Sequence, residues 1–315
     1  LPSNNHQQIN HRCAMKRQYL KYGAVVVAGA ILLLWLFCLP RNLFEGVSYS
    51  TVVTDKNGEL LGARVADDGQ WRFPPCDTLP EKFVKALIEF EDRRFYSHCG
   101  VSVSAIGRAI VQNIRNGRVV SGGSTLSMQF IRLSRQKPRT IWQKIVEMFM
   151  ATRLEARYSK EEILRIYASH APFGGNVVGI DAALWRYLGN DGAELSWAEA
   201  ATLAVLQNAP SLIHLDKNRD ALLAKRNRLL TRLYEKGELS SDDYELAIEE
   251  PLIGEPYPMP QYAPHLVEHY HKTAHGKLTT TAIDLSLQQR VEELATRWSK
   301  ELRGQNIRDI AVVIS

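Results

Sequence analysis

The chain has 315 residues, room for two domains of ordinary size, and its 39 lysines and arginines against 34 aspartates and glutamates give a formal net charge of +5. Neither a helix-turn-helix signal nor an aromatic RNA-binding motif accompanies this charge, so we expect no nucleic-acid partner. No repeat with a period of about 20 to 50 residues is visible, which excludes a solenoid. The chain opens on Leu1 and stops within a strand-like apolar run at residues 310–314, which predicts a piece of a longer protein.

An uncharged, strongly apolar run covers residues 22–40. Its length is close to the roughly 20 residues that a helix needs to span a bilayer. Basic residues cluster before the run, at Arg12, Lys16, Arg17 and Lys21, whereas Arg41 alone follows directly. The positive-inside rule then predicts a single-pass anchor in the cytoplasmic (inner) membrane, with residues 1–21 as a cytoplasmic tail and the rest on the outer, periplasmic face. A cleaved signal peptide is the alternative, because residues 28–30 have the small-residue pattern of a cleavage site, although they lie inside the apolar run.

Beyond the apolar run, the pattern predicts a mainly α-helical protein. From residue 80 to about residue 250 the apolar periodicity is helical almost throughout. Residues 47–65 look like a β-hairpin, because a β-prone stretch precedes a turn rich in Asp, Asn and Gly. Prolines then gather after residue 251, and a strand at residues 278–281 and a helix at about 285–303 follow.

These changes in pattern divide the chain into six parts. They are a tail at residues 1–21, a transmembrane helix at 22–40, a β-containing connector at 41–73, a helical domain at 74–251, a proline-containing linker at 252–277 and a truncated α+β segment at 278–315. Of the four cysteines, Cys76 and Cys99 fall outside the predicted membrane and could form a disulfide. Two free or buried thiols are the alternative, since the spacing is irregular and is not that of metal ligands.

Glu91 and Asp92 end a predicted amphipathic helix that opens with Pro80. The apolar residues Val84, Leu87 and Ile88 recur at helical spacing, which puts Glu91 at the edge of a buried face. A partly desolvated carboxylate in such a position suits a general base. The alternative is that the two carboxylates only balance the positive charges of Arg93 and Arg94 at a solvated helix end.

Two further segments contain residues suited to an anionic substrate. Gly122 and Gly123 precede Ser124, which we expect to cap a helix whose N-terminal N–H groups favour an anion. Thr140 opens another helix, in which Lys144 and Glu147 are three residues apart and therefore neighbours. Lys144 and Glu147 could equally form an ordinary exposed ion pair. Two carboxylates near a cationic groove suit glycosyl transfer from a phosphate-linked sugar, because one removes a proton from the acceptor hydroxyl while the cations stabilise the departing pyrophosphate.

In these residues and their order the chain resembles glycosyltransferase family 51, the peptidoglycan glycosyltransferases. The likeness covers about residues 74–251, and its motifs occur in order. They are Glu91-Asp92-x-x-Phe95-x-x-His98-x-Gly100 continuing to Arg108, Gly123-Ser124-Thr125-x-x-x-Gln129 with Arg132, Lys144-x-x-Glu147, and Lys160-x-x-Ile163-Leu164-x-x-Tyr167. The loop at residues 171–176 resembles the penicillin-binding protein 1C branch, and residues 278–289 are similar to the start of that branch's transpeptidase domain.

The resemblance implies a lysozyme-like fold with a membrane-embedded lobe, and it implies polymerisation of lipid II into glycan strands with release of undecaprenyl diphosphate. Glu91 would be the general base and Glu147 the second catalytic carboxylate, which could also hold a divalent Mg or Mn ion. Substrate-binding residues would be Asp92, Phe95, His98, Arg108, Gly123, Ser124, Thr125, Gln129, Arg132, Lys144 and Lys160. His98 could instead stabilise the turn after the helix. Partners would be lipid II, the growing strand, the inner membrane and other proteins of cell-wall synthesis.

The chain departs from the family pattern at Arg132, where lysine is usual, and at Met128, Gln143 and Ser169, where glutamine, arginine and asparagine are usual. Gln143 removes one cation, so pyrophosphate contact could shift to Arg135 or Arg139. Two alternatives use the same residues differently: a lysozyme-like lytic enzyme that cleaves glycan strands, and a degenerate membrane scaffold without activity. Residues 134–137 match the Ser-x-x-Lys pattern of penicillin-binding sites, but no Lys-Thr-Gly follows, and we interpret the match as coincidence.

Overall fold

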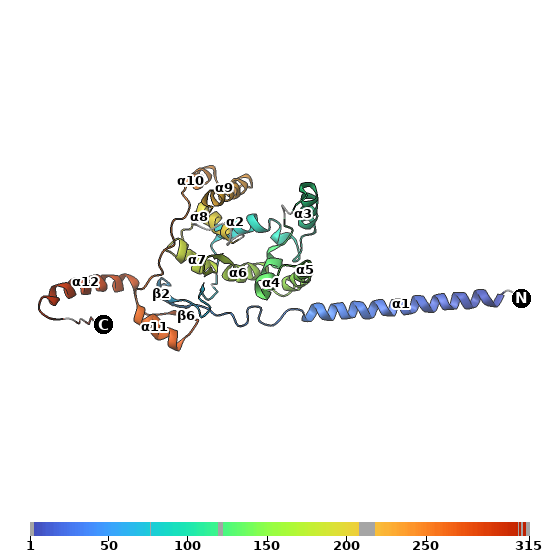
Figure 1. Cartoon of the computed structure of the whole chain (residues 1–315), viewed down its shortest axis with the longest axis horizontal. Coiled ribbons are helices and arrows are strands. Elements are labelled where there is room, and N and C mark those ends of the chain that lie inside the picture. The colour runs from blue at the N-terminus through green and yellow to red at the C-terminus, as the bar shows by residue number, and fades with distance from the viewer. Residues whose placement is uncertain are drawn as a thin grey trace. The chain divides into compact units, whose positions relative to one another are not determined.

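In the computed structural model the chain is mainly helical, as its periodicity predicts (Figure 1). The structure describes residues 3–75, 77–118, 122–207, 218–307, 309 and 311–312, and within residues 3–20 it describes the side chain of residue 18 alone. The α-helices are α1 (Ser3–Phe37), α2 (Glu81–Glu91), α3 (Val103–Asn116), α4 (Leu126–Arg135), α5 (Ile141–Glu155), α6 (Lys160–His170), α7 (Ile180–Tyr187), α8 (Trp197–Leu206), α9 (Arg219–Glu235), α10 (Ser241–Glu249), α11 (Pro264–Thr273) and α12 (Leu285–Arg303). The strands are β1 (Thr51–Thr54), β2 (Leu60–Arg64), β3 (Trp71–Arg72), β4 (Pro172–Gly174), β5 (Val177–Val178) and β6 (Leu278–Thr280), and Phe95–Ser97 form a 3₁₀ turn.

The chain divides into two compact units. The first comprises Leu1–Glu45 and Tyr96–Lys160, and the second comprises Gly46–Phe95 and Glu161–Ser315. The division falls just after the helix that ends in Glu91, so the candidate site residues belong to both units.

In the first unit, helices α4 and α5 pack against each other and their apolar side chains form the core. Leu126, Met128, Phe130 and Ile131 of α4 and Leu154 of α5 are completely buried. Met128, a departure from the family pattern, is therefore a core residue. This packing fixes one helix that follows the Gly-Gly-Ser-Thr loop against another that carries Lys144 and Glu147.

The C-terminal end of α1 is attached to α5 by side-chain contacts. Trp35 Nε1 donates to Thr152 Oγ1 at 2.9 Å, and the Arg153 guanidinium lies 5.1 Å from the centre of the Trp35 ring. Arg157 donates to the carbonyls of Pro40 and Arg41, at 2.8 and 2.9 Å. Arg153 Nε also donates to the Leu36 carbonyl in the last turn of α1 at 3.4 Å, so these contacts dock both the end of α1 and the segment that follows it.

A membrane-spanning helix at residues 22–40 is not confirmed. Within the described part of the chain, none of the helices combines the length and the apolar character that crossing a bilayer requires.

In the second unit, α2 packs on α8, and both helices contact α9. Helix α8 is alanine-rich and almost completely buried, and it begins with a capping box, because Ser196 and Glu199 have the residue types and the three-residue spacing that this motif needs. Phe83, Ala86 and Leu87 of α2 are completely buried. The apolar face of α2 therefore holds the helix that ends in Glu91.

The predicted hairpin is present, and it belongs to a larger sheet. Strands β1 and β2 pair antiparallel, and β6 pairs parallel to β1 on its other side, giving the order β2-β1-β6. Helix α11 packs on this sheet through Val267, which is buried with Val53 and Leu61. A second small sheet has the order β3-β5-β4. Residues 278–280, expected to open a separate segment, thus complete a sheet with the N-terminal hairpin.

Several local expectations differ from the structure. Thr125 rather than Ser124 caps α4, since Thr125 Oγ1 accepts a hydrogen bond from the Met128 N–H at 3.2 Å. Pro80 is the N-cap of α2 rather than its first helical residue. Cys99 is exposed, but Cys76 lies outside the described residues, so a disulfide between them stays a prediction. Most of the expected strand at residues 310–314 also lies outside the described residues.

Candidate active site

Glu91 is the last residue of α2, and the chain turns directly after it. The buried Asp92 is the C-cap of α2: its N–H donates to the Ile88 carbonyl at 2.9 Å, and its own carbonyl accepts from the Phe95 N–H at 2.9 Å. Phe95 is completely buried, which anchors the turn in the second unit. Glu91 itself is partly buried. The predicted amphipathic helix with two carboxylates at its end is thus confirmed.

In the first unit, His98 and Gly100 form a tight loop against α5. The Gly100 N–H donates to His98 Nδ1 at 3.1 Å, so this ring nitrogen carries no proton there. Gly100 has φ +91°, and a Cβ atom on it would lie 2.4 Å from the Ala151 carbonyl oxygen. This position therefore requires glycine. The contact agrees with the expectation that His98 stabilises the turn.

The carboxylate of Glu155, whose side chain is 6% exposed, connects this loop to two other segments. Glu155 accepts a short hydrogen bond from Ser127 Oγ of α4 and forms an ion pair with Lys160 Nζ at 2.6 Å. Lys160 also donates to the His98 carbonyl at 2.8 Å, and Glu155 lies 3.7 Å from His98 Nδ1. Sequence reasoning missed Glu155 and Ser127. The only signal was a carboxylate at the end of an apolar helix, which by itself predicts a solvated helix end.

The Gly-Gly-Ser-Thr segment approaches α3 closely before it enters α4. A Cβ atom on Gly123 would lie 2.8 Å from Ile106 Cα, so glycine is needed here for a close backbone contact. The buried Thr125 hydroxyl donates to the Gly100 carbonyl at 2.6 Å while it caps α4. Ser124 is only partly buried. Thr125 thus has a structural role, and Ser124 is the residue of this pair with an accessible side chain.

Arg132 of α4 and Glu147 of α5 lie side by side in the first unit. Arg132 Nε is 3.8 Å from Glu147 Oε1, and Glu147 is 8% exposed. Arg132 Nε is itself buried and has no hydrogen-bond acceptor among the described residues. Lys144 is exposed one turn before Glu147. In the described structure the ion-pair contact of Glu147 is therefore with Arg132, whereas the alternative of an ordinary exposed pair would have placed it with Lys144.

The remaining predicted residues lie on the same two helices or beside them. Gln129 is partly buried one turn after Thr125 on α4, and Arg108 is exposed on α3. Arg135 Nη1 donates to Gln143 Oε1 at 2.9 Å, which places the guanidinium of Arg135 beside the position where the family usually has arginine. The first unit thus brings together His98 with Lys160, and Arg132 with Glu147. Glu91, Asp92 and Phe95 belong to the second unit.

Comparison with known proteins identifies the family of this chain. A family described as transglycosylase matches residues 57–234, more than half of the chain's length. The chain belongs to the transglycosylase family. Penicillin-binding protein 1C of Escherichia coli K12 is 40% identical to it over 264 residues, which are 84% of this chain and 34% of that protein. Penicillin-binding protein 1A of Aquifex aeolicus is 33% identical over 283 residues, 85% of this chain and 39% of that protein.

The transglycosylase-family chain spans between a third and two fifths of the length of these two relatives. The family expected from the motifs is confirmed. A solved structure of penicillin-binding protein 1A from Haemophilus influenzae aligns with 76% of this chain and 27% of its own, at 17% identity and a TM-score of 0.37, which is too low to bear on the fold.

The donor set around Glu147 does not form a preformed metal site. Its carboxylate has the Arg132 guanidinium as a neighbour, and the described residues contain no group of three or more His, Cys, Asp and Glu side chains that could hold a metal ion. Mg²⁺ is often bound by only one or two carboxylates together with substrate phosphates. The divalent ion therefore stays a prediction, and no chemical step is assigned to it.

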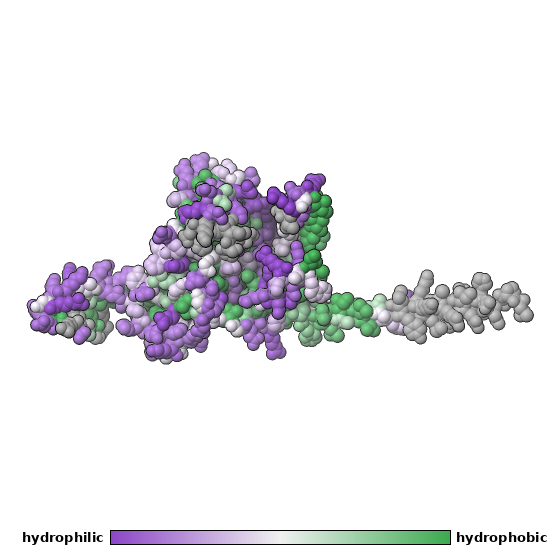
Figure 2. All heavy atoms as spheres, in the orientation of Figure 1, coloured by the Kyte–Doolittle hydropathy of each residue, from purple (hydrophilic) through white to green (hydrophobic). Residues whose placement is uncertain are grey.

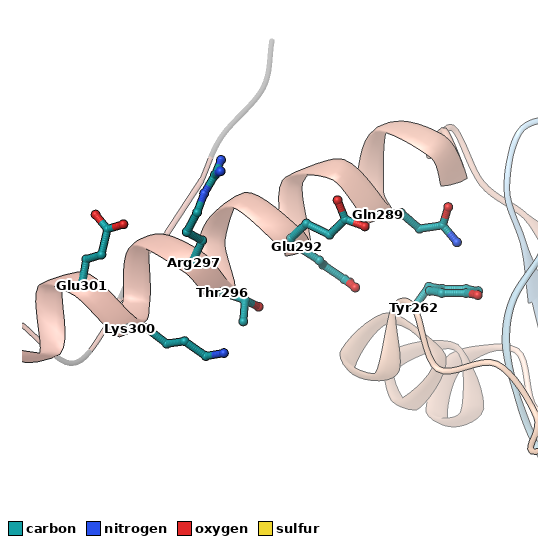
Figure 3. A pocket seen from close by; sticks show the side chains of 8 residues that line it. Tyr262, Gln289, Glu292, Thr296, Arg297, Lys300 and Glu301 are labelled. Atoms are coloured by element: carbon teal, nitrogen blue, oxygen red, sulfur yellow. The ribbon is translucent and has the colours of Figure 1, made fainter.

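A cavity of about 860 Å³ lies along α12. It is lined by charged and polar side chains of α12, with Tyr262 opposite Gln289 at one end (Figure 3). None of the predicted catalytic or substrate-binding residues lines it. Its size alone gives no reason to place the chemistry there.

Exposed apolar side chains gather on three helices of the first unit. Val103 and Ile114 of α3 and Ile141 and Trp142 of α5 are each at least two-thirds exposed. The second half of α1 is apolar and exposed as well, and Figure 2 shows hydrophobic side chains over both α3 and this part of α1. Contiguous exposed apolar surface on a soluble protein is rare and marks a protein or membrane contact.

Proposed function

We propose that this chain is the glycosyltransferase segment of a peptidoglycan polymerase, which joins lipid II molecules into glycan strands and releases undecaprenyl diphosphate. Membership of the transglycosylase family and the similarity to penicillin-binding proteins support this proposal. The chain covers only a part of those relatives. The proposal therefore concerns glycosyl transfer, and we do not expect transpeptidase activity from this segment.

The observation that carries the proposal is the pair formed by Arg132 and Glu147. A buried guanidinium nitrogen without an acceptor is costly unless a ligand supplies one. The exposed Lys144 adds a second cation on α5. Two cations in this arrangement suit a diphosphate leaving group, because charge-assisted hydrogen bonds to phosphate oxygens strengthen as negative charge develops on them.

In the proposed reaction, Glu91 accepts the proton of the acceptor's 4-hydroxyl group. The hydroxyl oxygen then forms a bond to C1 of the donor sugar, and the bond between C1 and the diphosphate oxygen breaks. The diphosphate leaves with the electron pair of that bond. Arg132, Lys144, Arg108, Ser124 and Gln129 would bind the phosphates and sugars, while Arg135 supplies the guanidinium that Gln143 does not.

Glu147 would be the second carboxylate, and it would hold Arg132 in position for the leaving group. A divalent Mg or Mn ion would reach this place together with the diphosphate and would neutralise part of its charge. Other motif residues would act through the loop. Lys160 donates to the His98 carbonyl and pairs with Glu155, so we propose that Lys160 and His98 position the segment after Glu91. Asp92, Phe95, Gly123 and Thr125 would help to position it through their buried contacts.

We propose further that the chain works at the periplasmic face of the cytoplasmic membrane, with residues 1–21 in the cytoplasm and residues 22–40 as its anchor. The exposed apolar side chains of α3 and α5 support contact with a lipid surface. The attachment of α1 to α5 supports the same orientation. The unit that contains these helices would be the membrane-embedded lobe of a lysozyme-like fold. Proteins of cell-wall synthesis would be its partners.

A lytic enzyme and an inactive scaffold are the competing functions. A lytic enzyme has a leaving group without phosphate and has no need for the cations beside Glu147. Product analysis with purified lipid II, in detergent and with or without EDTA, separates the three. Growing glycan strands support the proposal, cleavage of added strands supports the lytic enzyme, and no product in any condition supports the scaffold. Loss of strand growth with EDTA, restored by Mg²⁺ or Mn²⁺, would support the metal.

A further inference from the structure

Glu89, two residues before Glu91 on α2, is a buried carboxylate surrounded by cations. It is 2% exposed. Arg93 Nε lies 2.8 Å from one of its oxygens, Lys236 Nζ lies 2.5 Å from the other, and Arg232 Nε lies at 3.8 Å. Burial of a carboxylate is costly unless cations compensate its charge, and these three cations do so here.

The three cations come from two helix ends. Arg93 follows α2, whereas Arg232 is in the last turn of α9 and Lys236 is the C-cap of α9. Burial lowers the pKa of Arg232, and the nearby Arg93 lowers it further, whereas Glu89 opposes that effect. The negative charge of Glu89 therefore compensates the repulsion among these cations. Through them, Glu89 links the last turn of α2 to the last turn of α9.

The place of Glu89 on α2 bears on the proposed base. Residues two apart on an α-helix point about 200° apart around its axis, so Glu89 can fix the turn from one side while Glu91 projects from another. The last turn of a helix frays unless it is held. In α2 the turn is closed by the hydrogen bond from the Asp92 N–H to the Ile88 carbonyl, which Glu89 and Arg93 flank.

We infer that Glu89 is a positioning residue: with Arg93, Arg232 and Lys236 it immobilises the last turn of α2 and thereby places the carboxylate of Glu91. This inference rests on the proposed function of Glu91. A general base that is misplaced by about 1 Å can lose on the order of 100-fold in rate, although the substrate still binds. Glu89 should therefore affect kcat and leave KM nearly unchanged.

The test compares Glu89→Gln and Lys236→Met with a matched control, Lys85→Met, in the full chain in detergent. Lys85 is also on α2 and also has two carboxylate partners, Glu81 at 2.8 Å and Glu238 at 3.2 Å, but it lies near the middle of the helix, before its last turn. We expect Glu89→Gln to lower kcat for lipid II about 10- to 100-fold with KM within about twofold. We expect Lys236→Met to lower kcat about two- to fivefold, because Arg93 and Arg232 still pair with Glu89, and Lys85→Met to leave kcat unchanged.

A second readout does not depend on activity. Amide hydrogen exchange at Asp92 should become at least tenfold faster in Glu89→Gln and stay unchanged in Lys85→Met, because only the first change loosens the last turn. Unchanged kcat in a folded Glu89→Gln protein would overturn the inference, as would an equal loss of kcat in Lys85→Met. If Glu89→Gln does not fold, Lys236→Met takes its place: an unchanged kcat in Lys236→Met would then overturn the inference. Absence of lipid II turnover in the unmodified chain would instead overturn the proposed function, and hydrogen exchange would still test the role of Glu89.

Discussion

At the scale of single residues, replacing the cations beside Glu147 distinguishes a binding site for the leaving group from an ordinary surface ion pair. If Arg132 and Lys144 hold the diphosphate, replacing either with alanine should lower lipid II turnover about 10- to 100-fold, since a charge-assisted contact is worth about 1.5 to 3 kcal/mol. An ordinary surface charge would change the free energy of unfolding by a few tenths of a kcal/mol and turnover hardly at all.

Lys137 provides the control for these variants, because it is an exposed cation of the loop between α4 and α5. Lipid II turnover and urea unfolding should be measured for Arg132→Ala, Lys144→Ala and Lys137→Ala. Turnover that is unchanged in the first two would mean that the leaving group binds elsewhere.

Thr125 and Ser124 are adjacent, but their side chains have different tasks. Thr125→Ala removes the N-cap of α4 and the hydrogen bond to Gly100, so the free energy of unfolding should fall by about 1 to 2 kcal/mol. Ser124→Ala should change it by less than about 0.5 kcal/mol but should lower turnover, if Ser124 binds phosphate. Urea unfolding of the two variants tests this directly, and a larger loss of stability in Ser124→Ala would contradict the assignment of the cap.

At the scale of helices and strands, the sequence predicts local elements well and their partners poorly. The hairpin, the Ser196 capping box and the helix ending in Glu91 follow from residue types at short spacing, and all three are present. The pairing of β6 with β1 joins residues more than 200 positions apart, and no local pattern specifies it. The sequence does not distinguish Ser124 from Thr125 as the N-cap of α4, because either hydroxyl can accept a hydrogen bond from the first turn of the helix. The Gly100 carbonyl, which accepts a hydrogen bond from Thr125, favours Thr125.

The candidate site shows the same division. Glu91, Arg132, Lys144 and Glu147 could be named from motifs, because a motif fixes residue type and order. The contact of Glu147 with Arg132, rather than with Lys144, depends on the packing of α4 on α5. Glu155 could not be found at all, since its three partners come from separate segments.

His170, at the end of α6, makes the stability of the second unit depend on pH. Its ring accepts from or donates to Tyr49 at 2.8 Å, and burial lowers its pKa from 6.5 to about 4. Because the unfolded chain binds a proton more readily, stability is fully present above about pH 6.5 and falls as the pH drops toward 4. At about 1.4 kcal/mol per pH unit, the full loss is roughly 3 kcal/mol.

Urea unfolding at several pH values between 7.5 and 4 measures this loss. The free energy of unfolding should depend much less on pH in His170→Gln than in the wild type. The exposed His265 of α11 provides a control, because His265→Gln should show the same pH dependence as the wild type. The same pH dependence in the wild type and in His170→Gln would show that other groups cause it.

At the scale of the whole molecule, the Ser-x-x-Lys match at residues 134–137 has no penicillin-site geometry. Ser134 is next to the last residue of α4 and donates to the Ile131 carbonyl at 3.0 Å. The chain then leaves the helix at Gln136, which has φ 49°, so Lys137 does not follow Ser134 by one helical turn. We therefore expect no covalent labelling of this chain by a fluorescent penicillin. Stoichiometric labelling that disappears in Ser134→Ala would contradict this expectation.

The central claim is that this transglycosylase-family chain polymerises lipid II with Glu91 as the general base. Loss of a general base costs roughly 100- to 10,000-fold in rate, whereas Glu91→Gln preserves the size and most of the hydrogen bonding of the side chain. The most direct measurement is the rate of glycan-strand formation from lipid II by the wild type and by Glu91→Gln, with the unfolding transition of both recorded. The account predicts strand growth by the wild type and a loss of at least about 100-fold in a Glu91→Gln protein that unfolds at the same urea concentration. Near-normal strand growth by Glu91→Gln would contradict it.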